Sequence, residues 1–149
     1  MSESARPGRR PLGRPATFAL GVAAASLPPI VGGVLVSRHL LPGDSFWIAA
    51  PFGLIPLSGV LAGLAARRAG LKGSPIGAAL SVPVGVGLGW VVAMLVSLPL
   101  DASQESAQTL FFALLSTFVL PWWVGPLLLA MGIAWFVGRN RWGGRPGEV

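Results

Sequence analysis

The side chains that could do chemistry are few, and they lie mostly outside the apolar parts of the chain. The 149-residue sequence has one histidine, no cysteine and five acidic residues. A metal centre needs several His, Cys or carboxylate ligands at coordinating spacing, and a serine hydrolase needs a histidine base beside its serine. Ser58 lies in an apolar stretch, whereas His39 lies in a loop. We therefore predict no catalytic residue, no cofactor and no metal, in a protein that is not an enzyme.

Two further features have a weak chemical interpretation. Ionisable residues inside membrane spans mark proton relays and ion paths, and the apolar stretches here contain none. The run Val84–Gly89 looks like a carbonyl-lined cation filter, but such filters contain Thr and Tyr, so a close-packed helix face is the better interpretation. We interpret His39 as a surface loop residue rather than a pH sensor.

The elements that must position any site are long and apolar. The chain is 53% hydrophobic and 11% charged, against about 25% charged for an ordinary soluble domain. Its charged residues all lie outside four stretches, which are 16–37, 46–66, 75–100 and 110–138. About 20 apolar residues in a helix cross a bilayer, and lipid forces the backbone to satisfy its own hydrogen bonds. The predicted fold is an all-α integral membrane protein with four transmembrane helices.

The fourth stretch has two interpretations. Trp47 and Trp142 suit aromatic belts at the membrane surfaces, whereas Trp122 and Trp123 fall in the middle of 110–138. We expect one long, tilted, kinked helix. The alternative is a segment partly in the outer interface over 110–120, followed by a short span that begins at Pro121, which places both tryptophans in the outer belt.

Each stretch has proline near its middle, which removes a backbone donor and predicts a kinked helix. The hydroxyls of Ser26, Ser58 and Ser81 are expected to cover the carbonyls that proline frees. A faint parallel repeat relates 24–28 to 79–83, and chance similarity is the alternative. The prolines concerned are Pro28, Pro29, Pro51, Pro56, Pro83, Pro121 and Pro126.

Basic residues set the predicted orientation. Ten of the eleven Lys and Arg lie in the tails 1–15 and 139–149 or in the middle loop, and Arg38 alone lies on the other side. The positive-inside rule places both termini in the cytoplasm, in a multi-pass protein of the cytoplasmic (inner) membrane. The first span could instead end in a signal-peptidase site at 23–25, but its apolar run continues too far. The candidates for fixing topology and touching lipid headgroups are Arg67, Arg68, Lys72, Arg139 and Arg141.

The same basic residues flank membrane spans, so their expected partners are anionic headgroups rather than nucleic acid. Small residues mark the expected helix contacts, because close backbone approach drives association in lipid. Gly59 with Gly63 and Gly85 with Gly89 form two GxxxG pairs, through which we expect spans two and three to touch. A contact between two copies is the alternative.

These features favour a small non-catalytic accessory or scaffold component of a membrane assembly. Its partners would be the lipid bilayer and another membrane protein or a second copy of itself. The alternative function is a passive or weakly coupled carrier or channel for a small solute, suggested by the proline-rich spans.

Overall fold

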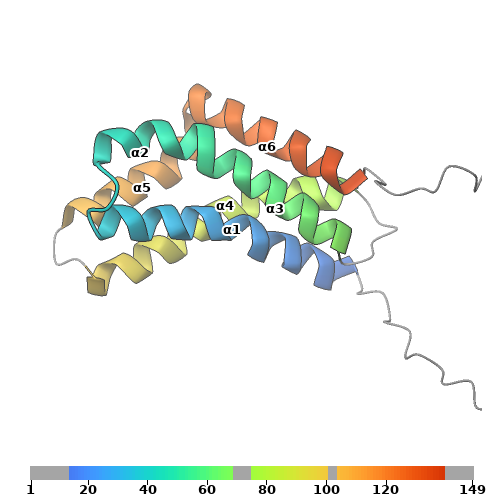
Figure 1. The fold of residues 1–149 in the computed structure, drawn as a ribbon, viewed down its shortest axis with the longest axis horizontal. Helices are drawn as coiled ribbons and strands as arrows, with labels where there is room; N and C mark the ends of the chain where they lie inside the picture. The colour runs from blue at the N-terminus through green and yellow to red at the C-terminus, as the bar shows by residue number, and fades with distance from the viewer. Residues whose placement is uncertain (1–13, 69–74, 101–103, 140–149) are drawn as a thin grey trace, which may run out of the picture.

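Every regular element in the described part of the chain is a helix (Figure 1). The computed structural model describes residues 14–68, 75–100 and 104–139. Its elements are α1 (Arg14–Ser37), α2 (Gly43–Ala49), the π-helical turn η1 (Ala50–Leu54), α3 (Ile55–Arg68), α4 (Pro75–Leu100), α5 (Gln104–Val119) and α6 (Pro121–Arg139).

Four helical segments are long and apolar enough to cross a membrane. They are Phe18–Ser37, Asp44–Arg68, Ile76–Ser97 and Pro121–Arg139. The second segment joins α2, η1 and α3 without a gap, and it begins earlier than the expected residue 46. Pro42 occupies the position before its first turn, and Asp44 lies in that turn, where a negative charge interacts favourably with the helix dipole.

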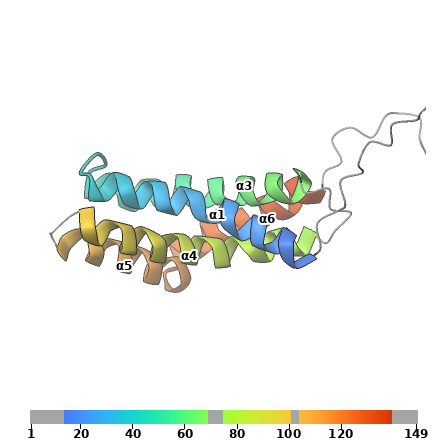
Figure 2. The same cartoon turned by 90° about the horizontal axis from the view of Figure 1, so that it is seen from below.

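The spans form a closed ring in which each packs against two neighbours. α1 packs most extensively on α4, and α3 packs on both α6 and α1. A contact between α4 and α6 closes the ring, so that α3 and α4 lie across the bundle from each other with less contact. α5 lies beside α4 in both views (Figures 1 and 2). Spans far apart in the sequence, the first and third and the second and fourth, are therefore the closest partners.

The expectation of one continuous helix over 110–138 is wrong, because α5 and α6 are separate helices divided at Leu120. The Leu120 N–H donates to the Ser116 carbonyl oxygen at 3.0 Å, and the Leu120 carbonyl accepts from the Val124 N–H at 2.9 Å. Pro121 has no N–H to donate to Thr117, so the α-helical ladder stops there and Pro121 becomes the first residue of a new helix. The alternative interpretation, in which a short span begins at Pro121, agrees with this division.

Pro51 has a different effect on the second span. It also lacks an N–H, and the chain widens into η1, where the N–H at Ile55 bonds to the carbonyl five residues earlier, at Ala50. The helix then continues as α3. One backbone irregularity next to a proline thus lies within the second span, and another lies immediately before the fourth.

α1 ends in a Schellman motif built on His39. His39 has φ of 54°, in the left-handed region that non-glycine residues enter rarely. The His39 N–H donates to the Val36 carbonyl at 3.0 Å, and the Leu40 N–H donates to Leu35 at 2.9 Å. These two bonds satisfy carbonyls at the helix end. His39 therefore helps to end the first span, a role that the sequence did not suggest.

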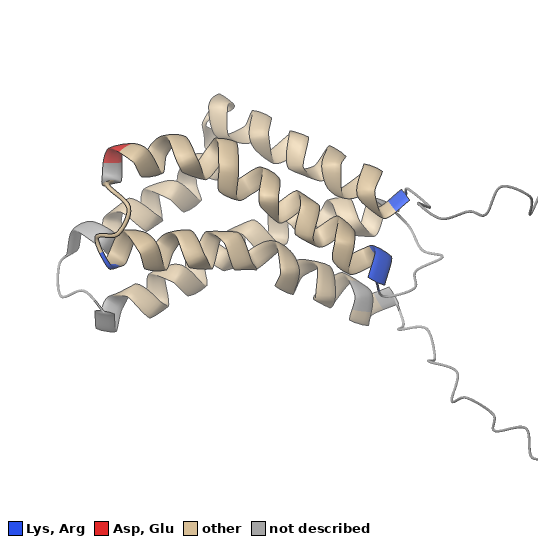
Figure 3. Cartoon of the chain, in the orientation of Figure 1, with Lys and Arg blue, Asp and Glu red and all other residues tan. Residues whose placement is uncertain are grey.

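The described charged side chains lie at the two ends of the bundle (Figure 3). Arg68 and Arg139 lie at the end where α1 begins and α6 finishes, which we call the terminal end. Arg38 follows the last residue of α1, and Asp44 lies in the first turn of α2, so both are at the opposite end, which we call the distal end. The described chain therefore begins and finishes at the same end of the bundle.

Candidate functional site

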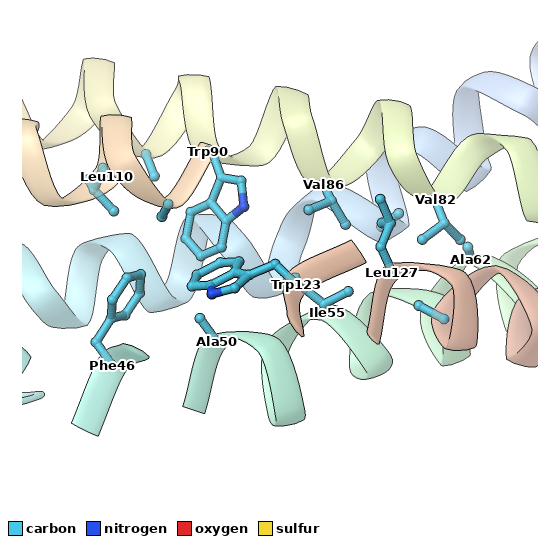
Figure 4. Packing of buried hydrophobic residues seen from close by; sticks show 14 of the residues in the cluster. Phe46, Ala50, Ile55, Ala62, Val82, Val86, Trp90, Leu110, Trp123 and Leu127 are labelled. Atoms are coloured by element: carbon cyan, nitrogen blue, oxygen red, sulfur yellow. The ribbon is translucent and has the colours of Figure 1, made fainter. Parts of the chain in front are cut away.

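Four aromatic side chains from three spans meet inside the distal half of the bundle. Their ring centroids are 5.9 Å apart for Phe46 and Trp47, 5.6 Å for Trp47 and Trp123, 6.4 Å for Trp123 and Trp90, and 5.7 Å for Trp90 and Phe46. Each ring therefore contacts two others in a closed circuit, which we call the aromatic cluster (Figure 4 labels three of its members). Three of the four pairs are edge-to-face, the geometry that the ring quadrupoles favour.

The break at Leu120 sets the position of one member of this cluster. Neighbouring residues on a helix point about 100° apart. At the start of α6, Trp123 therefore points into the bundle and is 3% exposed, whereas Trp122 is 72% exposed. The alternative interpretation of the sequence placed both tryptophans together in the outer belt. The structure separates it into one core residue and one surface residue.

Trp90 is fully buried, and its indole N–H has a defined partner. It donates to the hydroxyl oxygen of Thr117 on α5 at 3.1 Å. The Thr117 hydroxyl in turn donates to the Ala113 carbonyl at 2.7 Å. Burying an unpaired N–H is costly, so this bond makes the indole compatible with an apolar core. It also ties α5 to α4.

A pocket of about 300 Å³ adjoins the aromatic cluster. Both backbone irregularities contribute to its walls, because Pro51 and Phe52 belong to η1 and Leu120 is the residue between α5 and α6. The remaining lining residues are Trp47, Trp122 and Trp123. π-Helical turns are frequent at functional sites. This apolar, aromatic pocket is the candidate binding site of the described chain.

The remaining hydroxyls do not have the expected role. Pro28, Pro56 and Pro83 leave the carbonyls four residues earlier without their regular donors. The nearby serine hydroxyls donate instead to other carbonyls of their own helices. Their bonds run from Ser26 to Ala23 at 2.8 Å, from Ser58 to Leu54 at 3.0 Å and from Ser81 to Ala78 at 2.8 Å. These bonds satisfy the serines themselves, and the expectation that they cover the freed carbonyls is wrong.

Both glycine pairs lie at helix contacts, but with other partners than expected. A Cβ at Gly59 would collide with the Ala130 backbone of α6, and one at Gly63 would lie 2.7 Å from Val137 Cβ. A Cβ at Gly85 would lie 2.7 Å from the Val22 carbonyl oxygen of α1. The other member of the second pair, Gly89, would meet the Ser26 carbonyl oxygen at 2.6 Å. Span two thus uses its glycines against span four, and span three against span one, because spans two and three lie across the bundle.

The basic candidates lie away from the pocket. Arg67 and Arg68 are exposed in the last turn of α3. Arg139 lies at the end of α6, with its guanidinium carbon 4.9 Å from the centre of the Trp135 ring, a cation–π distance. Lys72 and Arg141 lie outside the described residues. Within residues 14–68, 75–100 and 104–139, no three His, Cys, Asp or Glu side chains gather at a spacing that could hold a metal.

No family model matches the sequence, no curated protein matches it, and no solved structure matches its fold.

Sequence reasoning missed the pairing of Trp90 with Thr117, which are 27 residues apart. The sequence contained a signal for this pairing. Both residues have polar groups within otherwise apolar stretches, and in lipid such groups form hydrogen bonds with polar groups on other helices. Their meeting depends on where α5 lies beside α4. That position follows from the break at Leu120, which the apolar pattern did not reveal.

Proposed function

We propose that the chain is a multi-pass protein of the cytoplasmic membrane with both ends in the cytoplasm. The four crossings are α1, the continuous α2–η1–α3 segment, α4 and α6, with α5 beside the distal half of α4. This orientation is supported by the basic residues at the terminal end and by the positive-inside rule. Kinks at Pro28, Pro29 and Pro83 belong to the same proposal, since proline weakens the helix there.

Within that membrane, we propose a non-catalytic role as an accessory or scaffold component of a larger assembly. The single observation that carries this proposal is the open face of α6. Only 22% of that span is buried, against 39 to 44% for the other three. Gly125 and Gly132 have no atom within 4 Å of where a Cβ would stand, and Trp122, Leu129 and Phe136 are exposed around them. A partner helix packing here would find both small residues for close approach and large side chains for contact.

The test is recovery of a partner from membranes in mild detergent. We expect a stoichiometric membrane protein to copurify with the wild-type chain. Gly125→Leu and Gly132→Leu place bulk on the open face and should reduce that recovery at least tenfold. Gly77→Leu is the matched control, because Gly77 on α4 also has open space around it. Purification of the wild-type chain and of both variants without any partner protein would overturn the proposal.

A passive or weakly coupled carrier for a small apolar solute is the second candidate. It is favoured by one specific observation, the meeting of η1 and the α5–α6 break at the aromatic pocket. Irregular backbone at membrane depth is typical of transporter binding sites. Purified chain in liposomes should then accelerate solute flux, and Leu120→Trp should slow it. Flux equal to that of protein-free liposomes would eliminate this candidate.

A further inference from the structure

The pocket beside the aromatic cluster lies at a particular depth. Trp47 and Phe52 follow the start of α2 at Gly43 by four and nine residues, or about 6 and 14 Å along the helix axis. With the membrane surface near Gly43, Trp47 lies at the level of the aromatic belt, and Phe52 lies within the hydrocarbon of the leaflet at the distal end. Phe52 and Trp122 are 69% and 72% exposed, so two of the lining residues lie on the outer surface of the bundle, which faces lipid in the proposed membrane location.

The size of the pocket limits what it can hold. Its volume is about 300 Å³, at the lower end for small-molecule sites. Its six lining residues are far fewer than the 20–30 residues that each side of a stable protein interface contributes. A second copy of the chain is thus a poor occupant.

The chain's own tails are a poor occupant as well. The described chain begins at Arg14 and finishes at Arg139, both at the terminal end, whereas the pocket lies in the distal half. The tails contain most of the basic residues, among them Arg9, Arg10 and Arg141. Drawing such charges into hydrocarbon is expensive. An uncharged lining of tryptophan, phenylalanine, proline and leucine instead matches an uncharged hydrocarbon.

We propose that this pocket binds one hydrocarbon chain of a membrane lipid from the leaflet at the distal end. The inference rests on the proposed membrane location, and its pocket shares Trp122 with the open face of α6. Transfer from bilayer to pocket brings no hydrophobic gain, so retention depends on dispersion contacts with close-packed walls. The aromatic cluster supplies such walls. The Trp123 ring packs against the Trp90 ring, and the Trp90 indole N–H donates a hydrogen bond to the Thr117 hydroxyl. The lipid is therefore retained when the loosely held surface lipids are washed away.

The first experiment counts retained lipid. The full chain is reconstituted with a phospholipid brominated in mid-chain, extracted into mild detergent and weighed by native mass spectrometry. We expect one brominated lipid per chain. Leu120→Trp places an indole in the pocket and should lower this occupancy at least fivefold. Leu129→Trp is the matched control. Leu129 is an exposed leucine on α6, with 58% of its surface accessible, but it does not line the pocket. Equal occupancy in the two variants would overturn the proposal.

A second measurement requires no pocket-filling variant. Replacing Trp122, Trp135 and Trp142 with Phe leaves tryptophan only at positions 47, 90 and 123, all in the aromatic cluster. Bromine quenches indole emission on contact. A chain in the pocket should quench Trp123, which is 3% exposed, together with Trp47. Quenching confined to a single exposed tryptophan would contradict the proposal, and so would a dimer without lipid in the mass spectrum.

Discussion

The indole N–H of Trp90 on α4 donates a hydrogen bond of 3.1 Å to the hydroxyl oxygen of Thr117 on α5, and both residues are fully buried. The hydrogen bonds of Ser26, Ser58 and Ser81 each join a serine hydroxyl to a carbonyl oxygen of the same helix. The Trp90–Thr117 bond differs because it joins two helices. It also fixes the wall against which Trp123 packs, so the position of a short helix is coupled to the shape of the aromatic pocket.

Removing the Thr117 hydroxyl should loosen this junction. Thr117→Val keeps the shape of the side chain but leaves the Trp90 N–H buried without an acceptor. We expect a loss of about 1 kcal/mol in the free energy of unfolding, in the range measured for hydrogen bonds between membrane helices. Ser97→Ala is the control, because the Ser97 hydroxyl bonds to Met94 in its own helix. Denaturant titration in detergent micelles measures both variants, and equal losses would contradict this role for Thr117.

The two glycine pairs should be intolerant of large side chains. Gly59→Leu and Gly85→Leu push a side chain into the backbone of α6 and α1 respectively. Such overpacking costs about 1–3 kcal/mol or more, and we expect a clear fall in the melting temperature in detergent. Gly132→Leu is the control, because the space beside Gly132 is open. If all three variants melt together with the wild type, the contacts described for Gly59 and Gly85 do not hold the bundle.

The left-handed backbone of His39 leads to a prediction about two substitutions at one site. His39→Gly and His39→Ala both remove the imidazole, but only glycine adopts φ of 54° without strain. We expect the Gly variant to be more stable than the Ala variant by about 1 kcal/mol. At Leu40, where φ is not positive, the order should reverse, because glycine has greater freedom in the unfolded chain. Thermal melting of the four variants checks both orders.

The proposed orientation can be tested with single cysteines, because the natural sequence has none. Ser45→Cys lies at the distal end beside Asp44, and Ala69→Cys follows Arg68 in the basic middle loop. A membrane-impermeant maleimide added to intact cells should label position 45 but not position 69. Permeabilised cells should show label at both. Labelling of Ala69→Cys in intact cells would reverse the orientation.

The apolar pattern located most of the fold because hydrocarbon rejects charge wherever it occurs. The stretch 75–100 is the helix α4 from end to end, and the stretch 16–37 differs from α1 by two residues at its start. The same pattern does not distinguish one helix from two when both are apolar. Pro83 stays inside α4, whereas Pro121 starts a new helix, and their sequence surroundings are similarly apolar.

The candidate site was harder to predict than the spans. Small residues identify faces that approach closely, but the partner of each face depends on the order of spans around the bundle. That order placed Gly59 against α6 and Gly85 against α1. The pocket likewise requires η1 and Leu120 to lie side by side, although they are far apart in the chain. Both features are consequences of packing between spans rather than of any local pattern.

The even number of helices that are long and apolar enough to cross a membrane has a consequence for gene duplication. Because Arg14 and Arg139 lie at the same end, two copies could be joined head to tail by a short polar linker, without an additional span to restore direction. Both halves of such a tandem protein would insert with the same orientation. The exposed α6 surfaces of the two halves could then accumulate different substitutions. Two initially identical surfaces would become two different ones.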